Sequence, residues 1–135
     1  MAEQSTLLIV KPDAVQRGLI GEVLSRVEAA GLRIEAMRMM EIDLELAERH
    51  YAEHSEKPFF GELVEFITSG PVVVARVRGD DAILVLRKLM GATDPAKADK
   101  GTIRGDFGTK ITHNLVHGSD AVESAKRELA LFFPD

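Results

Sequence analysis

The sequence has no cysteine and no tryptophan among its 135 residues, and its only aromatic residues are one tyrosine and six phenylalanines. The lack of cysteine excludes disulfides, thiolate nucleophiles and cysteine-based zinc or iron–sulfur sites. The stability of the fold must therefore come from its hydrophobic core.

Long hydrophobic runs and long runs of basic residues are also absent. No apolar stretch approaches the roughly 20 residues that a membrane helix needs. Residues 1–5 contain Glu3 and no basic residue, unlike the start of a secretory signal, so we expect a cytoplasmic protein. The 17 Lys and Arg residues are outnumbered by 22 Asp and Glu residues, which gives a net charge of −5. This balance argues against nucleic-acid binding through a basic stripe, so local groups must bind any anionic ligand.

The remaining composition, 45% hydrophobic and 29% charged, is typical of a globular protein and predicts a single domain over residues 1–135. An apolar run at 6–10 stops before Pro12 and predicts a strand that is buried on both faces. Alternating segments at 33–42 and 71–78 predict two more strands, the latter ended by Gly79, and residues 113–117 predict a short fourth.

Apolar residues spaced three and four apart predict helices between these strands. The clearest begins near Leu19 and ends at Gly31, where glycine suits a left-handed C-cap. The other expected helices cover residues 44–53, 60–67, 82–90 and 120–132. Asp80 or Asp81 is the expected N-cap of the helix at 82–90, which Gly91 ends, while Asp120 and Glu123 resemble a capping box for the last helix.

Residues 92–113 show no sustained period and predict a loop of about twenty residues, a length that is usually functional. The expected order is therefore β-α-β-α-α-β-α-loop-β-α. With right-handed crossovers, this order predicts an α+β sandwich in which helices cover one face of a four-stranded sheet.

Groups that bind phosphate are concentrated in the last fifty residues. They are Arg87, Thr93, Lys97, Lys100, Arg104, Asn114 and the turn at 117–120. His117 precedes a helix N-terminus, which favours anions, and Gly118 leaves room for a reacting group beside the imidazole. A neutral histidine is a competent nucleophile, although a histidine before a helix cap is more often structural.

Glu128 is a candidate partner for His117. A count of 100° per residue places it beside Ala125 and Phe132, at the margin of the inward helix face, where a carboxylate needs a partner. A hydrogen bond to one ring nitrogen of His117 would select the tautomer and leave the other nitrogen free to attack. The alternative is a Glu128 that reaches solvent.

Two further residues are candidates for ligand contacts. Phe59 lies about 90° from the centre of its helix stripe, so it can be exposed and stack on a base. Lys11 ends the first strand and could reach a phosphate or a hydroxyl. The alternatives are an incidental half-exposed aromatic and a surface lysine. His50 and His54 are four residues apart, but no third metal ligand follows at a matching spacing, so we expect structural roles for both.

Several motifs together resemble the nucleoside diphosphate kinase family over essentially the whole chain. The most specific is the stretch 114–120, Asn-Leu-Val-His-Gly-Ser-Asp. The others are the stretches at 11–18, 50–54, 57–60, 69–71, 91–95 and 101–107.

The resemblance implies a ferredoxin-like sandwich with a four-stranded antiparallel sheet and a long nucleotide-site loop. It implies transfer of the terminal phosphoryl group of a nucleoside triphosphate, chiefly ATP, to a nucleoside diphosphate by a ping-pong route through a phosphohistidine on His117, with broad base and sugar tolerance. Magnesium would be held mainly by the nucleotide's phosphates. The chain would form a homo-oligomer, a tetramer or a hexamer, and it ends soon after Phe133, without the extension that longer members use in subunit contacts.

The resemblance also assigns roles to individual residues. Glu128 would hold the far ring nitrogen of His117, with support from Tyr51 and Ser119. The phosphates would be held by Arg87, Thr93 and Arg104, and the sugar hydroxyls by Lys11 and Asn114, with Lys11 also reaching the phosphates. Phe59 and Ile111 would stack on the two faces of the base. The competing hypothesis is a non-catalytic ligand-binding module, which would not need His117, Glu128 and Arg104 together.

Overall fold

The computed structural model describes residues 3–109 and 113–134. Its sheet contains β1 (Glu3–Val10), β2 (Arg33–Met40), β3 (Val72–Asp80) and β4 (Val116–Gly118), in the order β2-β3-β1-β4. Every neighbouring pair is antiparallel. The predicted α+β class and the implied ferredoxin-like antiparallel sheet are confirmed.

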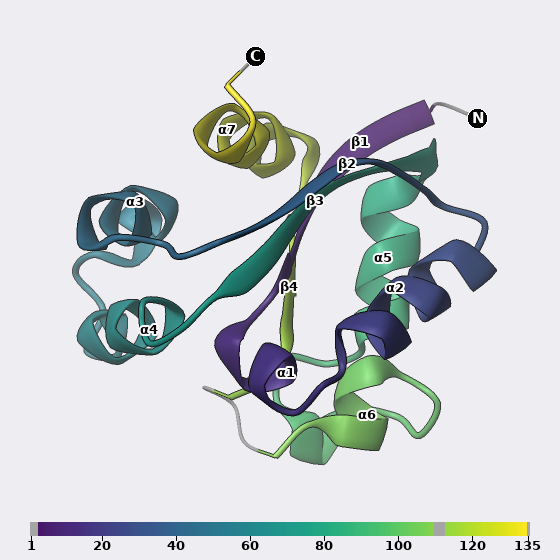
Figure 1. Ribbon diagram of the computed structural model, residues 1–135, viewed down its shortest axis with the longest axis horizontal. Helices are drawn as coiled ribbons and strands as arrows, with labels where there is room; N and C mark the ends of the chain where they lie inside the picture. Colours follow the sequence, from purple (N-terminus) through teal and green to yellow (C-terminus); the bar gives the residue numbers. More distant parts are fainter. Residues whose placement is uncertain (1–2, 110–112, 135) are drawn as a thin grey trace.

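Helices cover both faces of the sheet (Figure 1), so the expectation of one covered face is wrong. One face carries α1 (Pro12–Gln16), α2 (Ile20–Ala29), α5 (Ala82–Met90) and α6 (Ile103–Phe107), and the other carries α3 (Leu44–His50), α4 (Phe60–Ile67) and α7 (Val122–Phe132). The reason lies in β1, where Leu8 and Val10 pack into one core, Leu7 and Ile9 pack into the other, and all four are fully buried. The predicted burial of this strand on both faces is confirmed.

The strongly periodic helices form where the sequence predicts them. Gly31 follows α2 with a φ of 89°, and Gly91 ends α5 with a φ of 88°, a backbone region that glycine adopts without a steric penalty. The segment at 44–53 differs in detail, because α3 stops at His50 and a 3₁₀ turn, η1 (Ala52–His54), follows it.

Two predicted boundaries are wrong, and one predicted N-cap lies at the expected residue without the expected hydrogen bond. β3 continues through Gly79 to Asp80, because both residues pair with β1. Asp81 is the N-cap of α5, yet its side chain makes no capping hydrogen bond, and the Ile83 N–H donates to Gln4 Oε1 instead. At α7 the N-cap is Ala121, whose N–H donates to Ser124 Oγ, so the expected Asp120–Glu123 box does not form.

Three short helices were not expected. They are α1, α6 and the 3₁₀ turn η2 (Pro95–Lys97), and the last two lie within the segment predicted to be one long loop. Helix α6 is too short to show a period. It is stabilised by contacts instead: Thr102 Oγ1 accepts from the Gly105 N–H, and Arg26 pairs with Asp106 at 2.9 Å.

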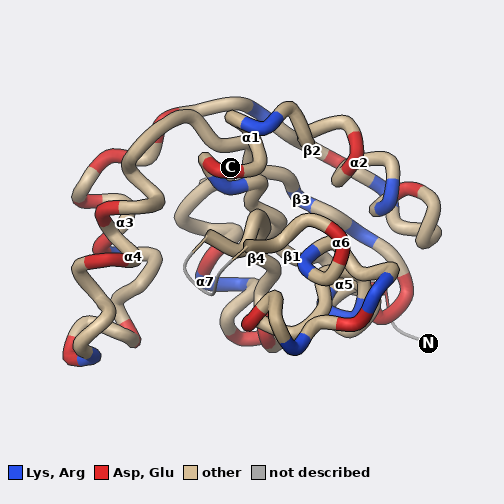
Figure 2. Tube along the Cα trace, turned by 90° about the horizontal axis from the view of Figure 1, so that it is seen from below, with Lys and Arg blue, Asp and Glu red and all other residues tan. Residues whose placement is uncertain are grey.

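Charge is distributed along the described trace without a continuous basic stripe (Figure 2). Blue and red segments alternate with neutral ones, and acidic residues are prominent on α3 and α4. Within residues 3–109 and 113–134, no helix is both long and apolar enough to span a membrane.

Candidate active site

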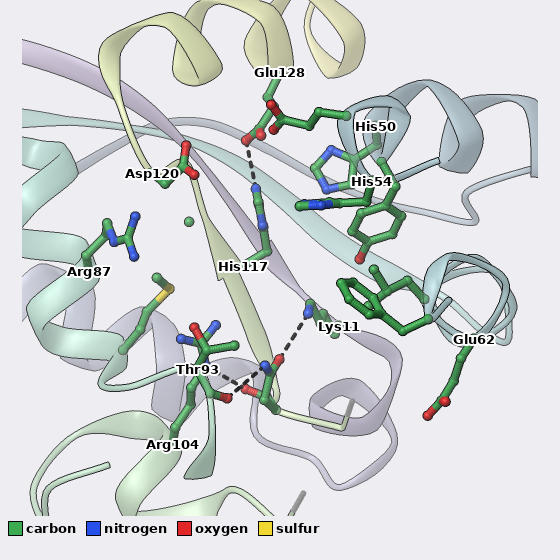
Figure 3. Close-up of a pocket in the computed structure, with 17 residues that line it drawn as sticks. Lys11, His50, His54, Glu62, Arg87, Thr93, Arg104, His117, Asp120 and Glu128 are labelled. Carbon is green, nitrogen blue, oxygen red and sulfur yellow. Dashed lines mark hydrogen bonds and ion pairs between the residues drawn. The ribbon is translucent and has the colours of Figure 1, made fainter. Parts of the chain in front are cut away.

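A cavity of about 740 Å³ opens beside β4, with α3 and α4 on one side and α5 on the other (Figure 3). Most of the predicted site residues line it. They are Lys11, Tyr51, Phe59, Arg87, Thr93, Arg104, Asn114, His117 and Glu128. Ser119 is fully buried behind the wall of the cavity, and the predicted Ile111 lies outside the described residues.

His117 and Glu128 form the predicted contact, with His117 Nε2 at 2.7 Å from Glu128 Oε1. Ser119 Oγ donates to the same carboxylate oxygen at 2.8 Å, and Arg127 lies 3.6 Å from the other. Burial raises the pKa of the Glu128 carboxyl, but the contacts with His117, Ser119 and Arg127 together outweigh this effect, so its pKa lies below the ordinary value. The carboxylate is thus ionised and accepts a hydrogen bond from Nε2–H. This leaves Nδ1 as the basic ring nitrogen.

Lys11 and Asn114 are joined across the base of the cavity. Lys11 Nζ donates to Asn114 Oδ1 at 3.0 Å, and Asn114 Nδ2 donates to the Thr93 carbonyl at 3.1 Å. Burial and the nearby Arg104 charge lower the pKa of Lys11 to about 8, against a smaller opposing effect of Asp13. The ammonium is therefore present at neutral pH but poorly hydrated, which strengthens its attraction for a phosphate.

Asp13 and Leu115 hold this region in place, and neither stood out in the sequence. Leu115 has a φ of 78°, a left-handed conformation that a bulky residue rarely adopts. Its N–H donates to Asp13 Oδ2 at 3.1 Å, and its carbonyl accepts from the Lys11 N–H at 2.8 Å. These bonds fix the turn that carries Asn114 into the cavity and starts β4.

Arg104 is buried and makes three hydrogen bonds to backbone carbonyls. Its guanidinium donates to Asn114, Gly91 and Val116 at 2.7–3.2 Å. Because arginine has five N–H donors, two remain for a ligand. Burial, with repulsion from Arg87, lowers the pKa of Arg104 to about 10, so the Arg104 guanidinium is charged at neutral pH.

Phe59 and Tyr51 line the cavity on the α3–α4 side. Phe59 is 43% exposed, which confirms the predicted exposure. Tyr51 is buried, and its pKa is raised by that burial and by the Glu128 charge, so the hydroxyl remains a neutral hydrogen-bond donor.

His50 and Asp120 also line the cavity. Asp120 faces the cavity near Arg87 (Figure 3), and a hydrogen bond from Ser124 lowers the pKa of its carboxyl. His50 stacks edge to face on His117 with ring centroids 4.7 Å apart. No sequence pattern predicts this contact, since His50 and His117 are far apart in the chain.

Comparisons with known proteins identify the family of this chain. A family model described as nucleoside diphosphate kinase matches residues 4–135. A nucleoside diphosphate kinase of Rubrobacter xylanophilus is 62% identical over 96% of this chain and 98% of its own length. One from Exiguobacterium sibiricum is 58% identical over 96% of this chain and 94% of its own.

Two solved structures have the same fold as this chain. The halophilic nucleoside diphosphate kinase of Halobacterium salinarum, in complex with CDP, has a TM-score of 0.96 and 53% identity over 99% of this chain and 90% of that chain. The Aquifex aeolicus enzyme has a TM-score of 0.95 and 44% identity over 98% and 96%. The chain therefore belongs to the nucleoside diphosphate kinase family, whose members transfer phosphoryl groups between nucleoside triphosphates and nucleoside diphosphates.

Proposed function

We propose that His117 carries the phosphoryl group between the two nucleotides, with Nδ1 as the attacking atom. The contact between His117 Nε2 and Glu128 carries this proposal, because it occupies one ring nitrogen and leaves the other as the nucleophile. Within residues 3–109 and 113–134, the only side-chain hydrogen bond of the His117 ring is the one at Nε2, so Nδ1 is unoccupied. His117 also lines the cavity.

The reaction then has two half-reactions. The Nδ1 lone pair attacks the γ-phosphorus, the bond to the β–γ bridging oxygen breaks, and the nucleoside diphosphate leaves with that electron pair. A β-phosphate oxygen of the second nucleoside diphosphate then attacks the phosphohistidine, and the N–P bond breaks. The Nε2 proton stays on the ring throughout, next to the Glu128 carboxylate, which stabilises the positive charge that develops on the imidazole.

The positive groups of the cavity would hold the phosphates. Lys11 lies between β1 and α1, Arg87 in α5 and Arg104 in α6, and all three line one cavity. Thr93 adds a hydroxyl. Positioning and charge neutralisation account for most of the catalysis of phosphoryl transfer, so this cluster is what the reaction requires. Asn114 and Lys11 would contact the sugar hydroxyls and Phe59 would stack on the base, with Ile111 on its other face. These contacts do not involve the hydrogen-bonding edges of the base, which supports broad base tolerance.

Magnesium would enter with the nucleotide. Mg²⁺ prefers oxygen ligands in octahedral geometry. The one cluster of three or more His, Asp or Glu ligands found in the described part of the chain contains two imidazoles, so it is not a magnesium cage. The nucleotide's phosphates would therefore supply most of the ligands, and the ion would neutralise phosphate charge.

The oligomeric state is proposed from the edge of the sheet. β2 pairs only with β3 in the described structure, and its Met37 and Met39 side chains are 56% and 57% exposed. An open edge with exposed apolar side chains favours pairing with a second copy of the chain. We expect a dimer through this edge as the unit of a tetramer or hexamer in the cytoplasm, and light scattering of Met39→Lys should show a smaller particle.

Acid-labile phosphorylation tests the histidine proposal. The protein is incubated with ATP and Mg²⁺, freed of nucleotide and analysed by intact mass, with His117→Ala alongside. We expect one acid-labile phosphoryl group per wild-type chain, on Nδ1 by NMR, that added GDP discharges to GTP. Label on the variant, or none on a folded wild type that binds nucleotide, would overturn the proposal.

A further inference from the structure

His50, the last residue of α3, has a buried imidazole that is 3% exposed. Neither of its ring nitrogens has a hydrogen-bond partner within residues 3–109 and 113–134. An unpartnered buried polar group costs about 1–3 kcal/mol and is rare in native structures. The proposed phosphoryl transfer does not use this residue, so its nitrogens call for another explanation.

The residues around His50 suggest that its nitrogens bind a metal ion. His50, His117 and Glu128 each offer one ligand atom, and these atoms lie within 4.8 Å of one another. The three residues come from α3, β4 and α7 and converge at one end of the cavity (Figure 3). No other group of three such residues is found in the part of the chain that the structure describes.

Two imidazole nitrogens and one carboxylate oxygen form a known donor set for zinc. Zinc binds histidine nitrogen at about 2.0–2.1 Å and carboxylate oxygen at about 2.0–2.2 Å, and such three-ligand sites keep one position open. Ligand atoms around one tetrahedral ion are roughly 3.3 Å apart at these bond lengths. The 2.7 Å separation of His117 Nε2 and Glu128 Oε1 would widen to that value. The other separations are at most 4.8 Å and would close by up to about 1.5 Å. In residues 3–109 and 113–134, His50 has no side-chain hydrogen bond that such a shift would break.

We propose that His50, His117 and Glu128 form a reversible binding site for Zn²⁺, with the fourth ligand position open to the nucleotide cavity. Mg²⁺ would not compete for this site, because it prefers oxygen ligands and dehydrates reluctantly. The site is distinct from the magnesium that accompanies the nucleotide.

Bound zinc would also inhibit phosphoryl transfer, a consequence that rests on the function proposed above. Zinc can bind His117 Nε2 only after that nitrogen has lost its proton, and the neutral ring then carries its proton on Nδ1. Protonated Nδ1 has no lone pair with which to attack phosphorus. Glu128 would bind the metal instead of accepting the hydrogen bond from Nε2–H.

The test begins with metal binding in the absence of nucleotide. The chelator-treated full chain is titrated with ZnCl₂ by calorimetry in excess Mg²⁺, and Co²⁺ is used to obtain a visible spectrum of tetrahedral coordination. His50→Phe fills the same space without a ligand atom. His54→Phe is the matched control. His54 also lines the cavity and has a buried nitrogen with no partner among the residues that the structure describes, but it lies outside the cluster.

We expect one zinc per chain for the wild type and for His54→Phe, and a Kd at least about tenfold higher for His50→Phe. X-ray absorption of the zinc-loaded wild type should show two imidazole ligands and one carboxylate, a readout that does not depend on the folding of a variant. Equal zinc affinity of wild type and His50→Phe, or fewer than two imidazole ligands, would overturn the proposal.

A second measurement separates this site from the proposed function. Phosphohistidine formation from Mg·ATP is followed with and without zinc, and a chelator should restore it. If zinc binds at the three residues while phosphorylation continues unchanged, the zinc site stands and the role proposed for Glu128 fails.

Discussion

Ser119 Oγ and His117 Nε2 share one acceptor, Glu128 Oε1, at 2.8 and 2.7 Å. Ser119 also accepts from the Leu7 N–H at 3.3 Å, so its hydroxyl connects the Glu128 carboxylate to β1. This chain of contacts holds the imidazole of His117 in one orientation and favours the tautomer with the proton on Nε2.

Glu128→Gln should lower the rate of phosphohistidine formation by about 100-fold or more, because the amide cannot stabilise the charged imidazole. Ser119→Ala should cost about tenfold, as expected for one hydrogen bond. Single-turnover transfer from ATP measures both. Ser124→Ala is the control, since Ser124 bonds the start of α7 and does not touch Glu128; an equal loss in this variant would indicate a general effect on α7.

The activity should fall in mildly alkaline solution. The pKa of Lys11 is about 8, below its usual value, so the ammonium is present below this pH and is lost above it. The kcat/KM for the nucleotide should therefore decrease as the pH rises through about 8, since this ratio reports groups of the free enzyme. Lys11→Gln should have a lower but flat profile across this range. A wild-type profile that is flat to pH 10 would contradict the role of Lys11.

Phe59→Ala should raise the KM for nucleoside diphosphates about tenfold with little change in kcat, because stacking contributes about 1–3 kcal/mol per base. The increase should be similar for purine and pyrimidine substrates. Phe59→Tyr keeps the ring and should restore the KM. Steady-state kinetics with GDP and CDP measures this effect, and a KM that does not change would exclude Phe59 from the base site.

Two helical glycines should respond in opposite ways to alanine. A Cβ at Gly105 in α6 would overlap the carbonyl of Asp99, whereas a Cβ at Gly21 in α2 meets no atom within 4 Å. Gly105→Ala should lower the free energy of unfolding by about 1–3 kcal/mol, and Gly21→Ala should raise it by about 0.5–1 kcal/mol. Urea unfolding midpoints measure both. A Gly105→Ala protein as stable as the wild type would show that the α6 turn can shift away from Asp99.

Local sequence patterns were sufficient for the regular elements and for several site residues. The run at 6–10 and the stripe over α2 predict their structures because burial recurs at the period of the element itself. The helical count that turns Glu128 inward succeeds for the same reason, and the Glu128–His117 contact is present. The four-stranded α+β fold follows from the order of these elements.

Packing between distant segments decided the rest. Helix α6 has only five residues, too few to show a helical period in the sequence. Its stability depends on contacts with Arg26 and Thr102. Lys11 and Asn114 are hydrogen-bonded although they are 103 positions apart in the sequence. The rings of His50 and His117 are in contact, and no sequence pattern links these two residues. Periodicity reports which face of one element is buried, but it does not report which element lies against that face. The cavity that joins these residues is therefore a property of the tertiary structure.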